Sequence, residues 1–130
     1  MATGLPGPAG WRDQGRHTLD SYGTALERLE GLERWARDHA LGDPAARAIW
    51  LVIARADLEG ELLTAAELVR RTGVTRYLGA RFLRRAAAQG LVQTGVAKYN
   101  AKHTGVCLTS EGRRYLIAAL DDFIADHMRA

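Results

Sequence analysis

The stretch from residue 64 to residue 92 constrains the fold most, because it begins with a strong local signal for a short helix. Thr64 and Glu67 have the spacing of a capping box, in which the Thr side chain and the Glu side chain satisfy the free amide groups of the first helical turn. A helix is therefore predicted over residues 65–72, and Gly73 is placed to end it.

A second helix follows almost at once. Thr75 can cap a helix over residues 76–89, and Gly90 fits the position that ends it. Two short helices joined by a tight turn containing glycine form a helix-turn-helix. Gly79, Phe82, Leu83 and Ala86 recur at helical spacing and are predicted to face inward, and the missing side chain of Gly79 would let the two helices approach closely.

The apolar period changes after the second helix. Leu91–Thr94 and Val106–Thr109 have the pattern of two strands, and glycines bracket the polar, basic segment between them. A β-hairpin wing is therefore predicted over residues 91–109. A helix-turn-helix followed by such a hairpin is a winged helix, so the predicted fold is mainly α with a small β-hairpin.

The rest of the chain is predicted to flank this motif as part of one domain, residues 18–130, of a size that buries its own core. Helices are expected over residues 21–40, 44–59 and 111–127, from apolar residues at helical spacing and from capping residues. Residues 1–17 are rich in Gly and Pro, which favours a flexible tail, although Trp11 stands out there as a large apolar side chain.

Charge is distributed very unevenly along the chain. From Arg70 to His103 there are eight Lys and Arg residues and no Asp or Glu, a charge of +8. The whole chain has 18 basic and 15 acidic residues, so the remainder holds ten basic and fifteen acidic ones, or −5. Like charges repel, so folding alone does not favour this arrangement, and a polyanionic partner such as nucleic acid would explain it.

The winged helix gives each basic residue an expected role on double-stranded DNA. The second helix of the motif would enter the major groove, with Arg76, Tyr77, Ala80 and Arg81 in its first half at the base edges. An arginine can bond a guanine through two hydrogen bonds, and a small alanine can meet a thymine methyl group. Contacts with the DNA backbone are expected from Arg70, Arg71, Thr75, Arg84, Arg85 and, on the wing, Lys98, Lys102 and His103.

The stretch from about Ala48 to Leu120 resembles the winged-helix regulators of the multiple-antibiotic-resistance (MarR) type. The resemblance rests on "AAELVRRTGVTRYLGARFLRRAAAQGLV", on the hairpin and on "LTSEGRRYL" directly after it. It implies a homodimer that reads a pseudo-palindromic operator and a response to a small-molecule effector. We expect such a regulator to act as a repressor.

The resemblance also implies that the first and last helices form the dimer interface. The residues expected there are Leu26, Leu29, Trp35, Leu120, Phe123 and Ile124. One departure is visible: the family normally has two helices after the wing, whereas only about 20 residues follow Ser110. The second helix is therefore missing or merged with the first.

Other chemistry finds little support in the sequence. Cys107 is expected to be a buried, inert thiol on a strand, with a redox sensor as the alternative. The four histidines lack zinc-ligand spacing, and Asp122 and Asp126 are expected to be an exposed helix end rather than a metal site. No catalytic motif or cofactor fingerprint is present, so neither an enzyme nor a cofactor is predicted.

The chain has no apolar run long enough to cross a membrane and no signal-peptide pattern, and it has a single cysteine. A cytoplasmic protein is therefore expected, associated with a bacterial nucleoid and making no membrane contact. Two alternatives to a sequence-specific regulator remain: a winged helix that acts as a protein-interaction adaptor, and an architectural protein that binds DNA without base preference.

Overall fold

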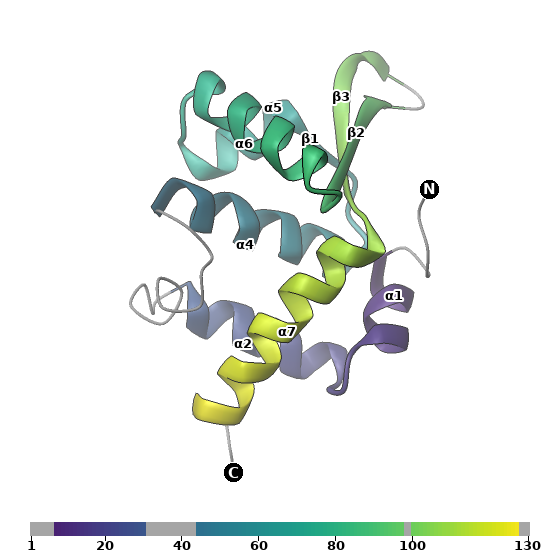
Figure 1. Ribbon diagram of the computed structural model, residues 1–130, viewed down its shortest axis with the longest axis vertical. Helices are drawn as coiled ribbons and strands as arrows, with labels where there is room; N and C mark the ends of the chain where they lie inside the picture. The colour runs from purple at the N-terminus through teal and green to yellow at the C-terminus, as the bar shows by residue number, and fades with distance from the viewer. Residues whose placement is uncertain (1–6, 31–43, 98–99, 128–130) are drawn as a thin grey trace.

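The computed structural model describes residues 7–30, 44–97 and 100–127. Figure 1 shows the helix-turn-helix and the sheet at one end of the molecule, a central helix α4, and helices α1, α2 and α7 at the other end. The elements are α1 (Gly7–Gln14), α2 (Leu19–Leu29), α4 (Pro44–Glu59), β1 (Leu63–Thr64), α5 (Ala65–Thr72), α6 (Arg76–Ala88), β2 (Val92–Ala97), β3 (Asn100–Leu108) and α7 (Ser110–His127).

The predicted winged helix is confirmed. α5 and α6 form the helix-turn-helix, with Gly73 in the left-handed conformation at the end of α5 (φ 73°). β2 and β3 form the wing as an antiparallel pair in which Val92 lies opposite Leu108. The short strand β1 pairs with the other edge of β3, so the sheet has the order β1-β3-β2. The predicted bounds of α4 and α5 agree with the structure, and α6 ends at Ala88, one residue earlier than expected.

The wing is joined tightly to its neighbouring helices at its base. The Thr109 hydroxyl donates to the Gly90 carbonyl (2.6 Å) and accepts from the Gly112 amide (3.0 Å), so this residue ties the end of α6 to the start of α7. Gly112 lies so close to Leu91 that a Cβ atom there would be 1.9 Å from the Leu91 carbonyl oxygen. This junction therefore requires glycine, and it fixes where α7 begins.

The expectation of a flexible tail over residues 1–17 is wrong from Gly7 onward. Residues Gly7–Gln14 form α1, and Trp11 is fully buried. The Trp11 ring packs edge-on against Tyr22, with 5.2 Å between the centroids, and its Nε1 donates to Asp57 Oδ2 (2.9 Å). The burial of one large aromatic side chain holds a segment whose Gly and Pro content suggested a mobile chain.

A buried ion pair lies behind Trp11 and connects three helices. Arg113 of α7 is 3 % exposed and donates to both carboxylate oxygens of Asp57 in α4, at 2.8 and 3.2 Å. Arg113 also donates to the Gln14 side chain of α1 (3.0 Å). The Trp11 indole N–H and the Arg113 guanidinium both donate to the Asp57 carboxylate, and Arg113 also donates to Gln14, so this cluster of four residues locks α1 to α4 and α7.

The first and last predicted helices differ in detail from those observed. α2 begins at Leu19 instead of residue 21, because Thr18 accepts a hydrogen bond from the Ser21 amide (3.1 Å) as its cap. Residues 31–40 of that prediction lie outside the described part of the chain. α7 begins at Ser110, one residue early, because Thr109 takes the capping role. In the described segments, no helix combines the length and the apolar character that a membrane crossing requires.

Candidate nucleic-acid interface

The position of α6 is set by its own apolar side. Thr75 caps the helix by accepting from the Leu78 amide (3.1 Å). Gly79, Leu83 and Ala86 are buried, and Phe82 packs edge-on against Trp50 of α4 with 5.0 Å between the ring centroids. The predicted inward side of this helix is therefore confirmed.

The glycine in the middle of that side permits a close approach between the two helices of the motif. A Cβ atom at Gly79 would lie 3.0 Å from Val69 Cγ2 of α5, tighter than an ordinary van der Waals contact. A larger residue at this position would require the Val69 side chain or α6 itself to shift. The glycine thus sets how the opposite side of α6 is presented to solvent.

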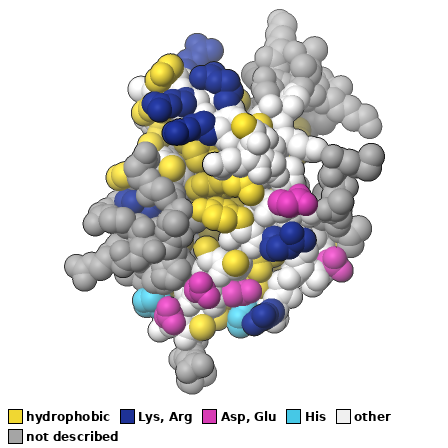
Figure 2. Space-filling view, viewed as in Figure 1, with side chains coloured by type: hydrophobic (Ala, Val, Ile, Leu, Met, Phe, Trp, Pro, Cys, Tyr) yellow, Lys and Arg dark blue, Asp and Glu magenta, His cyan; other side chains and the backbone are white. Residues whose placement is uncertain are grey.

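That opposite side of α6 is strongly basic. Arg76, Arg81, Arg84 and Arg85 are all exposed, and Tyr77 among them is 66 % exposed. None of these four arginines forms an ion pair with an acidic side chain in residues 7–30, 44–97 or 100–127. Figure 2 shows Lys and Arg side chains gathered at this end of the molecule, whereas most visible Asp and Glu side chains lie over the other half. The helix therefore presents positive charge that the described fold does not neutralise.

Arg70 and Arg71 of α5 differ from the arginines of α6, because both are paired within the protein. Arg70 donates to Glu67 (3.0 Å), and Arg71 donates to Glu67 (2.8 Å) and to Glu61 (3.1 Å). The hydrogen bonds from Arg70 and then Arg71 lower the pKa of Glu67 to about 2, and Arg71 also lowers the pKa of Glu61. A DNA phosphate would have to compete with these carboxylates for the two arginines.

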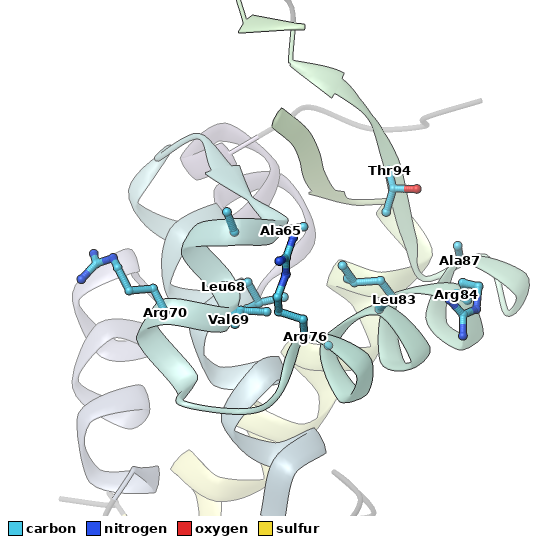
Figure 3. Close-up of a pocket in the computed structure, with 12 residues that line it drawn as sticks. Ala65, Leu68, Val69, Arg70, Arg76, Leu83, Arg84, Ala87 and Thr94 are labelled. Atoms are coloured by element: carbon cyan, nitrogen blue, oxygen red, sulfur yellow. The ribbon is translucent and has the colours of Figure 1, made fainter. Parts of the chain in front are cut away.

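A groove of about 890 Å³ runs between α5, α6 and β2. Its lining is mainly apolar and includes alanines from both helices, while Arg76 and Arg84 of α6 and Thr94 of β2 also line it. Figure 3 shows Arg76 reaching from α6 toward Ala65 at the start of α5, and Arg70 directed away along the outer side of α5. The groove separates the exposed residues of α6, because Tyr77, Arg81 and Arg85 do not line it.

The predicted DNA-contacting residues occupy several different positions in the structure. Tyr77, Arg81 and Arg85 are exposed outside the groove, whereas Arg76, Ala80 and Arg84 line it. Thr75 is exposed at the start of α6 but uses its hydroxyl as a cap. The side chains of Lys98, Lys102 and His103 on the wing lie outside the described part of the structure.

Sequence reasoning missed the groove itself, and with it Ala65, Ala66, Ala87 and Thr94. For Ala87 a signal was available, because it lies on the helical row that contains Arg76, Ala80 and Arg84. The other three are brought to the groove only by the packing of separate elements. Nothing in the sequence around these three short side chains indicates that they line a groove.

Five of the six residues expected at a dimer interface are core residues of this chain. Leu26, Leu29, Leu120, Phe123 and Ile124 are all buried where α2 packs against α7 and α4, and Trp35 lies outside the described residues. The assignment of these five side chains to a contact between subunits is therefore corrected. Their helical periodicity indicated that one side of each helix is covered, and the covering partner is another helix of the same chain.

Cys107 is also placed differently from the expectation. Val106 and Leu108 are buried on β3, so the alternation of a strand turns the Cys107 side chain between them to the exposed side. Partial desolvation, and then the negative charge of Asp57, raise the pKa of its thiol. The expectation of a buried thiol is thus wrong, while the raised pKa disfavours the reactive thiolate.

Among known structures, the chain is similar to winged-helix regulators. It matches the crystal structure of an S. aureus MepR–DNA complex with a TM-score of 0.57 and 13% identity, covering 79% of this chain and 80% of that one. It matches the transcriptional regulator PA4135 with a TM-score of 0.58 and 17% identity, covering 85% and 76%. A mutant MarR from E. coli matches with a TM-score of 0.54 and 16% identity, covering 82% and 73%.

These similarities show that the chain has the MarR-type winged-helix fold. No protein-family profile matches the sequence, and no curated protein matches it significantly.

Proposed function

We propose that this protein is a sequence-specific, double-stranded-DNA-binding transcriptional regulator of the MarR type. The observation that carries the proposal is the exposed side of α6, where four arginines lack a described acidic partner. The fold supports it, because one solved structure with this fold is a complex with DNA. A cationic helix of this kind fits the major groove, which is wide enough to admit an α-helix.

The proposed reading of bases uses the first half of α6. Tyr77 and Arg81 lie outside the groove on the exposed side and are assigned to base edges, with Arg76 and Ala80 beside them on the groove side. An arginine bonded to guanine O6 and N7 is typically worth roughly 1–3 kcal/mol of discrimination against the wrong base. Tyr77 offers a phenol hydroxyl and an apolar ring at an exposed position of the helix.

Contacts with phosphates are assigned to residues around the first half of α6. Arg84 and Arg85 continue along α6, Thr75 lies at its start, and the wing would bring Lys98, Lys102 and His103 to the backbone or the minor groove. Arg70 and Arg71 would join after release from Glu67 and Glu61. These contacts orient the protein on the duplex and add affinity for every sequence.

The proposal includes a homodimer that binds a pseudo-palindromic operator and represses transcription in a bacterial cytoplasm, at the nucleoid. Two copies of α6 would then read two half-sites. The dimer must use surfaces other than the buried residues of α2 and α7. A small-molecule effector that shifts DNA affinity also belongs to the proposal.

The test is a titration of a labelled mixed-sequence duplex with the protein at several salt concentrations, in which binding is measured by fluorescence anisotropy. We expect tight binding at low salt, with the log–log salt slope steepened by about 0.9 for each phosphate contact. The double variant Arg81→Ala/Arg84→Ala should bind weakly. The control Arg12→Ala/Arg16→Ala removes the same charge from exposed positions at the other end of the chain and should bind as the wild type does.

Selection of an operator from random DNA then tests specificity. Arg81→Ala should relax the base preference at one position of each half-site. Equal affinity for all sequences would favour an architectural DNA-binding protein. A wild-type protein that ignores DNA at low salt would refute the proposal and favour a role as a protein-interaction adaptor.

A further inference from the structure

The base of the wing consists of Gly90 and Leu91, which precede β2, and of Thr109 and Ser110, which follow β3. Two hydrogen bonds join these segments: the Thr109 amide donates to the Leu91 carbonyl (3.1 Å), and the Thr109 hydroxyl donates to the Gly90 carbonyl (2.6 Å). Thr109 is only 8 % exposed, so water competes weakly for these bonds. Both strands of the wing therefore extend from one hydrogen-bonded junction.

Helix α1 contacts this base of the wing from outside the winged-helix motif. Figure 1 shows α1 beside the start of α7, with the wing extending away from it. The Gln14 amide nitrogen donates to the Ser110 carbonyl (3.1 Å), 96 residues away, and the Gln14 amide oxygen accepts from Arg113 (3.0 Å). Because a guanidinium only donates, this orientation of the amide satisfies both partners. One side chain of α1 thus holds the first turn of α7 at two points.

The wing is long compared with its base, so a small rotation of the base displaces its far end. β3 has nine residues, which span about 30 Å at the usual strand rise of about 3.3 Å per residue. A rotation of about 5° at the base would move the far end of such a strand by about 2.5 Å. A hydrogen bond between a cation and a phosphate is only about 2.7–2.9 Å long, so a displacement of this size breaks it.

We propose that Gln14 is a positioning residue for DNA binding, whose hydrogen bond to the Ser110 carbonyl holds the base of the wing at the angle at which the wing reaches the DNA backbone. The inference rests on the proposed function, in which Lys98 and Lys102 of the wing contact phosphates. Gln14 does not itself contact DNA, because α1 lies at the end of the molecule away from α6 (Figure 1). It acts through the first turn of α7 and the two strands.

A purely structural role for Gln14 is the competing explanation, since its bond to Arg113 also stabilises the fold. The variant Gln14→Glu separates the two roles. A glutamate still accepts from Arg113, but it has no amide hydrogen to donate to the Ser110 carbonyl. The variant should therefore keep the stability of the wild type and release the base of the wing.

The experiment titrates a labelled mixed-sequence duplex with the wild type and with Gln14→Glu at several salt concentrations, and measures binding by fluorescence anisotropy. Loss of two phosphate contacts should make the log–log salt slope shallower by about 1.8, at about 0.9 for each contact, and should weaken binding at low salt about tenfold. The midpoint of urea unfolding should stay within about 0.5 M of the wild type.

Two comparisons show whether the loss arises at the wing. Arg12→Gln is the matched control, because it lowers the net charge by the same one unit at an exposed neighbouring position of α1, and it should keep the wild-type slope. In the background Lys98→Ala/Lys102→Ala, Gln14→Glu should cause no further loss, because the wing then has no such contacts to lose. Gln14→Met removes both hydrogen bonds with little change of shape and should show the same shallower slope.

The outcomes separate this inference from the proposed function. A wild-type slope and affinity in Gln14→Glu and Gln14→Met would overturn the positioning role and leave the proposed function standing. A loss of equal size in the background Lys98→Ala/Lys102→Ala would also overturn it, because the effect would not act through the wing. Absence of binding by the wild type to any duplex would overturn the proposed function, and this inference with it.

Discussion

Replacement of Asp57 by asparagine should destabilise the protein strongly, because the Asp57 carboxylate pairs with the buried guanidinium of Arg113. Arg113 is 3 % exposed, and the side chain of Asp57 is 15 % exposed, so water screens this pair weakly. Asparagine has the same shape and can still accept from Trp11 Nε1. The change therefore removes the negative charge while it keeps the packing.

The expected size of the effect follows from burial. Removal of one partner of a buried ion pair typically costs about 3–5 kcal/mol, since the remaining charge stays desolvated. Arg113 keeps its hydrogen bond to Gln14, and Asp57 has some contact with water, so we expect the lower end, about 3 kcal/mol. A domain of this size has a free energy of unfolding of roughly 5–15 kcal/mol, so Asp57→Asn should still fold in water.

Urea unfolding followed by circular dichroism measures this effect. The slope for a small protein is about 1–3 kcal/mol per molar urea, so the midpoint should fall by about 1–3 M with little change in slope. Glu59→Gln is the matched control: it removes a carboxylate of the same helix whose side chain is 54% exposed and 3.5 Å from Arg55. An exposed pair of this kind should be worth less than about 1 kcal/mol.

The result that would refute the reasoning is a loss below about 1 kcal/mol for Asp57→Asn, similar to that of Glu59→Gln. The carboxylate would then contribute little to the connection of α1 with α4 and α7. A second variant checks that charge imbalance is the cause. Replacement of both partners, as Asp57→Leu/Arg113→Met, should be less destabilising than Asp57→Asn alone, because no unpaired charge remains.

Three further changes test other parts of the structure. Gly112→Ala should lower the free energy of unfolding by at least about 2 kcal/mol, because its Cβ would meet a backbone oxygen, whereas Gly95→Ala, with nothing within 4 Å, should lower it by less than about 0.5 kcal/mol in the same urea assay. The Glu67 carboxylate has a pKa lowered to about 2 from 4.5, so its stabilising effect is present above about pH 4.5 and is lost as pH falls toward 2. The melting temperature of Glu67→Gln should therefore fall less steeply than that of the wild type as pH decreases over that range. A melting temperature with the same pH dependence as the wild type would contradict the pairing. The variant should also bind DNA more tightly, because Arg70 is released. Cys107 should react with a thiol reagent in the native state, but more slowly at pH 8 than a small free thiol, and failure to react without denaturant would contradict its exposure.

The parts of the fold that were predictable from sequence are those with local chemical signals. The bounds of α4 and α5 follow from Pro44, from the capping pair of Thr64 and Glu67, and from Gly60 and Gly73, which adopt the left-handed conformation that glycine tolerates. The inward side of α6 follows from apolar spacing. In each case the determining interactions lie within a few residues of one another.

The parts that were missed depend on contacts between distant segments. α1 is held by a contact from Trp11 to a carboxylate 46 residues away, which no local pattern reveals. Periodicity identified the covered sides of α2 and α7 but could not say whether the cover belonged to the same chain. The pairing of Arg70 and Arg71 with acids was hidden because Glu61 lies ten residues before Arg71.

The separation of charge seen in Figure 2 has a consequence for how the protein would meet a polyanion. Arg76, Arg81 and Arg84 lie at one end, whereas Asp121, Asp122 and Asp126 lie on the last turns of α7 at the other. In the field of a phosphate-rich surface the molecule experiences a torque as well as an attraction. The molecule would approach with α6 oriented toward the phosphates, so a larger fraction of encounters would have a productive orientation. Added salt would remove this effect, because it shortens the range of the electric field.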